Sequence, residues 1–277
     1  MNSYQGRALD LGPRTRGPRS PRPFRQPLRI AGLMAALLAL AMMPWGELRR
    51  RFAVVDRVKV TGLRYLDAER VRKRSGLAVG QDLFTLDVER ARQRVLMDPR
   101  IREAQVRHSG LRGVELAIVE RAPALTVAHG EPWEVDSSGV LLAPLQPGVV
   151  ADVPMLAGPD FSAYGPGTQI RTPQVQRGLA WTAALSDNAL RLAGQVSEVD
   201  VSDPRITRLV LMNGVQVVGP AWPPGMRQLS GLRATLADLE HKGMKPREID
   251  ARFPDQIIVR GVEPPATQVA AEATHRS

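Results

Sequence analysis

The side chains that could do acid–base or metal chemistry are few, and they are scattered along the chain. The four histidines lie at positions 108, 129, 241 and 275. A metal site needs several ligands whose spacing brings them together, such as two histidines four positions apart on a helix. No two of these histidines have that spacing, so each is expected to be a surface residue. The chain has no cysteine, which excludes disulfides and thiolate metal sites.

Other residues of catalytic type have ordinary structural explanations. Ser137 and Ser138 lie in a turn rather than in a G-x-S-x-G nucleophile elbow. The glycines between 158 and 167 have neither the lysine of a phosphate loop nor the spacing of a dinucleotide site. Asp200 and Asp203 could pair as carboxylates, but a proline follows Asp203, as is typical of turns. We therefore expect no enzyme: no catalytic residues, no cofactor site and no metal site.

Residues 30–46 form an uncharged stretch of seventeen residues that is rich in Ala, Leu and Met. Such a stretch would extend over roughly 26 Å as a helix, near the lower limit for crossing a bilayer. Trp45 is placed where an interfacial aromatic would anchor the helix. The pattern predicts one transmembrane helix over residues 29–46. Two alternatives are a cleaved signal peptide, with an A-x-A-like site at 39–41, and a buried helix of a soluble protein.

The charge of +10 is concentrated at the N-terminus. Residues 1–29 hold seven arginines and one aspartate, with five prolines among them. The prolines predict a disordered, extended tail over residues 1–28. The arginines either bind nucleic acid or keep the N-terminus in the cytoplasm, and because no aromatic stacking platform accompanies them, the second interpretation is favoured. Three more arginines, at 49–51, follow the apolar stretch on the outer side, so seven against three still favours an N-terminus inside.

After the apolar stretch, the pattern predicts a compact β-α-α-β-β unit. Alternating apolar and polar residues indicate strands at 54–61, 102–107 and 114–119, the last two joined by a glycine-containing turn at 109–113. Asp67 and Asp87 are typical helix N-caps, and Gly76 is a typical helix stop. The two helices are therefore expected at 67–74 and 88–97.

The ends and loops of this unit resemble a known domain. They contain Gly62 after the first strand, a Gly76-Leu-x-x-Gly80-Gln-x-Leu83 loop, Leu86-Asp87, and a closing Val119-Glu120-Arg121-x-Pro123. In their order and spacing these motifs resemble the POTRA domain of the FtsQ/DivIB family of bacterial cell-division proteins. The resemblance implies an α+β protein with a POTRA domain over residues 53–122 and an FtsQ-type β domain over residues 123–262.

The β domain has weaker motifs of its own. We expect two strands around the turn at 137–139, loops from 143 to 167, a helix at 172–185 and a strand at 196–201. Asn213-Gly214 between two apolar runs predicts a hairpin with a type I′ turn. A stripe of leucines predicts a helix that ends at Gly243. Pro254 places the segment 249–260 at a sheet edge or bulge, and residues 263–277 are expected to be disordered.

The resemblance also implies a function. In the FtsQ family the C-terminal strand receives the partner FtsB by strand addition, which implies a partner site at Arg252, Phe253 and Ile257, with Arg205 as a second cation. Such a protein is a divisome scaffold at the division septum of the inner membrane. It binds FtsB and FtsL and, through them, helps control the septal peptidoglycan synthases FtsW and FtsI. The alternatives are an outer-membrane assembly or secretion factor, in which POTRA units bind polypeptides, and a membrane-anchored nucleic-acid binder.

Overall fold

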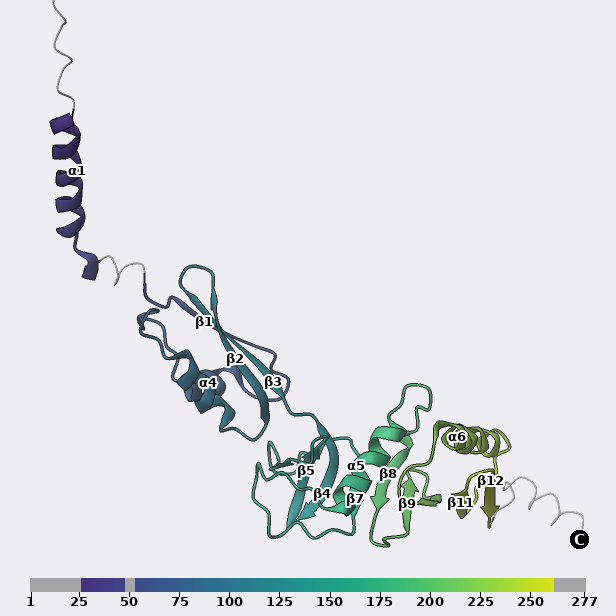
Figure 1. Ribbon diagram of the computed structural model, residues 1–277. Coiled ribbons are helices and arrows are strands. Elements are labelled where there is room, and N and C mark those ends of the chain that lie inside the picture. Colours follow the sequence, from purple (N-terminus) through teal and green to yellow (C-terminus); the bar gives the residue numbers. More distant parts are fainter. Residues whose placement is uncertain (1–25, 48–52, 262–277) are drawn as a thin grey trace, which may run out of the picture. The chain divides into compact units, whose positions relative to one another are not determined.

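The computed structural model describes residues 26–47 and 53–261 (Figure 1). The chain divides into two units, residues 1–52 and residues 53–277. The expected tails at 1–28 and 263–277 lie outside the described residues, apart from 26–28.

Within residues 26–47, a helical stretch at 45–47 follows the longer helix α1 (Gln26–Ala41). Its apolar side chains are exposed all round, including Ile30, Leu33 and Leu37 at 63%, 63% and 53%. α1 has 16 residues and does not extend to position 46 as expected. The helix ends before Pro44 because proline has no N–H to donate and disfavours helical backbone in the residue before it. Among the described helices, none combines the length and the apolar character needed to cross a membrane.

The second unit begins with a three-stranded sheet in the order β1-β3-β2, covered by two helices. Its elements are β1 (Arg57–Thr61), α3 (Ala68–Ser75), α4 (Val88–Leu96), β2 (Ile101–Ser109) and β3 (Gly113–Glu120). Asp67 and Asp87 accept hydrogen bonds from the N–H groups three residues later, as helix N-caps do, and Gly76 closes α3 with a φ of 74°. The expected β-α-α-β-β order is confirmed.

A nine-stranded sheet follows, in the order β12-β11-β10-β9-β8-β7-β4-β5-β6. The strands are β4 (Pro123–His129), β5 (Glu131–Asp136), β6 (Leu141–Leu142), β7 (Met155–Ala157), β8 (Val196–Asp200), β9 (Ile206–Leu211), β10 (Gln216–Pro220), β11 (Glu248–Phe253) and β12 (Gln256–Arg260). The helices are α5 (Pro173–Leu185), the short 3-10 helix η1 (Ala193–Gln195) and α6 (Met226–His241). A core of buried aliphatic side chains together with Phe161 and Trp181 joins α5 and α6 to this sheet.

Three expectations for this sheet are wrong in detail. β4 follows directly after the first sheet, where no strand was expected, and β7 lies inside the segment expected to be loops. β7 has only three residues, yet it pairs in parallel with both β4 and β8. The turn at Asn213-Gly214 is not type I′, since that turn needs a positive φ at both residues and only Gly214 has one, of 84°.

A buried ion pair joins the two sheets. Arg100 lies directly before β2, and one of its guanidinium nitrogens is 2.8 Å from a carboxylate oxygen of Glu134 on β5. Both side chains are less than a tenth exposed. The same guanidinium donates a hydrogen bond to the carbonyl of Ala143. Because a buried charge is costly without a partner, this pair ties the start of β2 to β5.

Candidate partner-binding edge

The C-terminal hairpin places β12 at one end of the nine-stranded sheet. β11 and β12 pair antiparallel, with a register shift between Asp250 and Phe253, and Pro254 and Asp255 form the turn. The expectation of an edge or bulge at Pro254 is therefore confirmed. Within the described residues β12 pairs with β11 alone. Alternate N–H and C=O groups of an edge strand point away from its neighbour, so β12 offers one row of backbone donors and acceptors to a further strand.

One face of this hairpin carries a cluster of charges centred on a carboxylate. Asp250 is fully buried, and its two oxygens accept hydrogen bonds from Nε and an Nη of Arg252, at 2.9 and 2.7 Å. Arg260 on β12 donates to Asp250 at 3.4 Å and to Glu248 at 2.9 Å. The hydrogen bond from Arg252 outweighs burial and holds the pKa of Asp250 below its ordinary value. The same bond raises the pKa of Arg252, whose side chain is 41% exposed.

Phe253 ends β11 beside this cluster. Its side chain is 44% exposed, and the guanidinium of Arg252 lies over its ring, 5.8 Å from the centroid. Gln228 on α6 donates through its amide nitrogen to the carbonyls of Ala251 and Phe253, at 2.6 and 3.0 Å. Arginine and aromatic side chains are the types most often found at interface hot spots. Neighbouring residues hold both Arg252 and Phe253 in the free chain.

Ile257 lies differently from the other expected contact residues. It is half-buried on β12 and packs against the core of the sheet. A Cβ added at Gly231 of α6 would lie 3.4 Å from the Cδ1 atom of Ile257. The Ile257 side chain therefore faces α6, opposite the charged face of the hairpin. Its contribution to a strand partner would come through the backbone of β12.

Arg205 lies in the turn between β8 and β9, and its side chain is 87% exposed. β9 begins where β10 ends, since Ile206 lies opposite Pro220, and β11 runs parallel to β10. Arg205 and Phe253 are thus at the same end of the sheet, two strand spacings or about 10 Å apart along the row of strands. The N–H of Arg205 donates to Asp203, which holds the pKa of this carboxylate below its ordinary value.

Buried Arg177 on α5 fixes the turn that carries Arg205. Its guanidinium donates to the carbonyls of Asp203 and Pro204, at 3.0 and 2.8 Å, and to the carbonyl of Val201. Only 4% of Arg177 is exposed. Three charge-assisted hydrogen bonds from Arg177 therefore hold this turn against α5.

Two residues near this edge were not predicted from the sequence. Asp250 is the carboxylate that orients Arg252, and the Asp-x-Arg spacing, which puts both residues on one face of a strand, was the available signal. Trp222 follows β10 at the same end of the sheet, and half of it is exposed. The Ala221 carbonyl next to it accepts hydrogen bonds from Trp181 and Thr207, at 3.1 and 2.8 Å. No sequence pattern indicated that the Trp222 side chain is exposed, so Trp222 was not predicted as a site residue.

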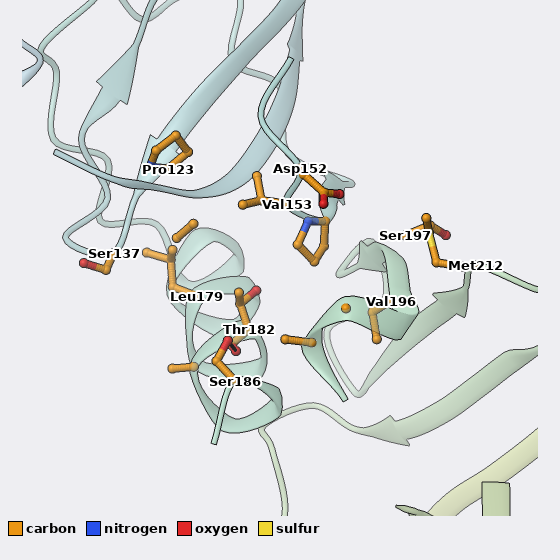
Figure 2. A pocket seen from close by; sticks show the side chains of 15 residues that line it. Pro123, Ser137, Asp152, Val153, Leu179, Thr182, Ser186, Val196, Ser197 and Met212 are labelled. Carbon is orange, nitrogen blue, oxygen red and sulfur yellow. Dashed lines mark hydrogen bonds between the residues drawn. The ribbon is translucent and has the colours of Figure 1, made fainter. Parts of the chain in front are cut away.

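A hollow of the second unit lies elsewhere, beside α5. It has a volume of about 700 Å³, and Figure 2 shows Leu179 and Thr182 on α5, with Ser186 just after the helix, facing Asp152 and Val153 across it. The Thr182 and Ser186 hydroxyls donate to helix carbonyls, at 3.0 and 2.7 Å. No histidine or lysine is among the lining residues, and Asp152 is the one carboxylate among them.

The histidines are also dispersed in the structure. His108 lies on β2 and His241 ends α6, while His129 stacks on Trp133 with ring centroids 4.0 Å apart. His275 lies outside the described residues. In the part of the chain that the structure describes, no cluster of three or more metal-binding side chains occurs.

Comparison with known proteins identifies similar chains. A family model described as "POTRA domain, FtsQ-type" matches residues 54–121. A protein of Streptomyces coelicolor named "Cell division protein FtsQ" is 28% identical over 233 residues, which cover 79% of this chain and 85% of that protein. A protein of the same name from an Anaeromyxobacter species is 26% identical over 263 residues, 92% of this chain and 87% of that one. Another, from Syntrophotalea carbinolica, is 27% identical over 164 residues, which cover only 58% of its length.

Proposed function

This chain belongs to the FtsQ/DivIB family of cell-division proteins, and on that premise we propose that it is a divisome scaffold that works by binding other proteins. Its second unit combines an FtsQ-type POTRA domain with a large mixed sheet. The proposed action is to join division proteins into one complex and so help control septal peptidoglycan synthesis. Recognition, not catalysis, is the proposed mechanism.

The partner proposed for β12 is FtsB, which would add a strand to the row of backbone groups facing away from β11. Strand addition supplies affinity through main-chain hydrogen bonds, and side-chain pockets and charges supply specificity. The observation that carries this proposal is the position of Arg252 and Phe253 beside an edge strand, with Arg252 fixed by buried Asp250. An acidic side chain on the added strand would meet the exposed part of the Arg252 guanidinium.

We propose FtsL as a further partner, bound together with FtsB, and FtsW and FtsI as synthases reached indirectly. Arg205 and Trp222 lie at the same end of the sheet as Phe253 and are exposed. They would extend the binding surface beyond the added strand. A surface of two arginines and two aromatic residues matches the composition of interface hot spots.

The proposed location is the inner membrane at the division septum, with the N-terminus in the cytoplasm. Residues 29–46 would form the membrane anchor, and the arginines of residues 1–28 would keep the tail inside. A helix that is apolar on all sides, as α1 is, needs an apolar environment. The short α1 would span a bilayer only with local thinning or with snorkelling of the flanking residues.

The test is a binding measurement between the full chain in detergent and the extracytoplasmic fragment of FtsB. The double variant R252A/F253A should weaken binding by about tenfold or more, since hot-spot truncations each cost more than about 1 kcal/mol. The matched control is R64A/Y65A in the POTRA domain. There an arginine also lies over the ring of the next aromatic residue, at 5.1 Å, and Tyr65 is 41% exposed. Equal affinities for both variants and the unaltered chain would refute the proposed site.

A further inference from the structure

The POTRA domain has a distinctive surface at the end where the chain enters it. Residues Ala53 to Asp56 lie between two loops and are bonded to both. On one side, the N–H of Asp56 donates to the carbonyl of Arg112 at 2.9 Å. On the other side, the Leu83 and Gly80 N–H groups donate to the carbonyls of Ala53 and Val55, at 2.7 and 2.8 Å. We call these two loops, residues 77–86 and 109–112, the entry loops.

The entry loops expose large apolar side chains. Leu111, at the tip of the β2–β3 hairpin, is 97% exposed, the highest value among the exposed large hydrophobic residues of the described chain. Phe84 and Val79, on the other entry loop, are 76% and 63% exposed. Apolar residues at loop tips cost solubility unless something covers them. Leu111 and Val79, one on each entry loop, therefore indicate an apolar surface at this end of the domain.

Positive charge surrounds the hairpin. Arg57 and Lys59 on β1 lie opposite Gly113 and Glu115 of β3, and Arg107 on β2 lies opposite Glu115 from the other side. With Arg112 this makes four cations against two carboxylates, those of Asp56 and Glu115, in residues 53–59 and 107–115. Asp82, on the other entry loop, accepts a hydrogen bond from the N–H of Phe84 at 2.8 Å. The hairpin side of the surface is therefore the side suited to an anion.

We propose that the entry loops bind the outer surface of an anionic phospholipid bilayer, with Leu111 inserted among the lipids and the neighbouring cations on the headgroups. This inference rests on the proposed membrane anchor. Five residues, 48–52, connect the last described residue of the first unit to Ala53. The six Cα–Cα steps from Glu47 to Ala53 extend over at most about 22 Å, so an anchor at residues 29–46 would keep Ala53 within reach of the bilayer.

The energetics fit a weak, additive contact. An exposed apolar side chain gains free energy when it leaves water for a bilayer, and a cation gains free energy near an anionic surface. Neither term would hold a protein on a membrane alone. Both would orient a domain that is already tethered, because the tether supplies a high effective concentration. The anionic headgroups would also serve as counter-ions for the exposed cations around the hairpin.

The test exploits the absence of cysteine from the chain. The full chain carries a single L111C substitution labelled with an environment-sensitive fluorophore and is reconstituted in vesicles of phosphatidylglycerol and phosphatidylcholine. Quenching by lipids with nitroxide-labelled acyl chains is then measured. The control is M212C, which carries the label on the β9–β10 hairpin, where Met212 is 69% exposed. Both positions are exposed turns, so neither label should disturb folding.

We expect quenching at position 111 at least about twofold stronger than at position 212, and weaker in phosphatidylcholine alone or at high salt. The variant R57E/K59E should lower quenching at position 111 in the anionic vesicles. Equal quenching at both positions, with the chain floating with the vesicles, would overturn the lipid surface and leave the anchor intact. A chain that does not float with vesicles at all would overturn both.

Discussion

The buried carboxylate of Asp250 holds the guanidinium of Arg252 through two hydrogen bonds, of 2.9 and 2.7 Å. Asp250 is fully buried while the Arg252 side chain is 41% exposed, so the pair reaches from the core of the sheet to its surface. This geometry fixes the cation beside the edge strand β12. An oriented arginine loses less entropy on binding than a mobile one, which favours affinity.

Replacing Asp250 by asparagine should therefore affect both stability and binding. We expect D250N to lower the free energy of unfolding by about 1.5–3 kcal/mol, as for hydrogen bonds to charged groups, in urea titrations. The double-mutant cycle with R252M should show a coupling of at least about 0.5 kcal/mol. Purely additive effects of the two substitutions would mean that the pair contributes nothing beyond its separate contacts.

Gly219 on β10 is predicted to be intolerant of a side chain. A Cβ there would lie 2.6 and 2.7 Å from two ring carbons of Trp181, which is almost completely buried. We expect G219A to destabilise the chain by about 1–3 kcal/mol through overpacking, as measured by urea unfolding followed by tryptophan fluorescence. G194A is the matched control, since an added Cβ at Gly194 meets nothing within 4 Å. Similar midpoints for the two variants would contradict the packing seen around Trp181.

The buried pair between Arg100 and Glu134 predicts a strong asymmetry between single and double substitutions. E134Q leaves the charge of Arg100 buried without a counter-ion and should cost about 3–5 kcal/mol. The double variant R100M/E134L removes both charges and should cost clearly less, because no unpaired charge remains. Urea titrations of the unaltered chain, E134Q and R100M/E134L give the comparison. If the double variant were the least stable, the pair would contribute more than its desolvation costs.

Asp136 predicts how stability depends on pH. Burial raises the pKa of its carboxyl, but hydrogen bonds from the Val140 N–H, Arg121 and Ser138 outweigh burial and lower the pKa below its ordinary value of 3.8. A carboxyl whose pKa is lower in the folded state stabilises the protein fully above its unfolded-state pKa. That stabilisation is lost as the pH falls through the folded-state pKa.

Unfolding measured at a series of acidic pH values checks this expectation. The free energy of unfolding should fall below about pH 4, and D136N should reduce the slope of that fall. Since the pKa of Asp250 is lowered too, D136N alone should leave part of the slope. An unchanged slope in D136N would show that Asp136 has the same pKa in both states.

The local elements of the POTRA domain were predictable because their signals are short-range. Asp67 and Asp87 cap helices through N–H groups three residues away, and Gly76 adopts a positive φ that other residues avoid. Pro254, which cannot donate to a ladder, marked the break between β11 and β12 and lies in their turn. In each case one residue type decides the local backbone.

The remaining features depend on contacts between distant segments. β7 has three residues, too few for any alternation to be recognised, and it exists because β4 and β8 flank it. The position of Arg205 near the end of β11 arises from the parallel pairing of β10 and β11, which no local pattern indicates. Asp250 was overlooked because its importance comes from burial, and burial is a property of the whole sheet.

Residue-resolved amide hydrogen exchange along β12, in the full chain with and without the FtsB fragment, tests strand addition most directly. In the free chain, amides that face β11 should exchange slowly, and alternate amides that face away should exchange fast. On adding FtsB, the fast set should become protected, so that the period-two pattern disappears. Binding of FtsB that leaves the pattern along β12 unchanged would contradict strand addition at this edge.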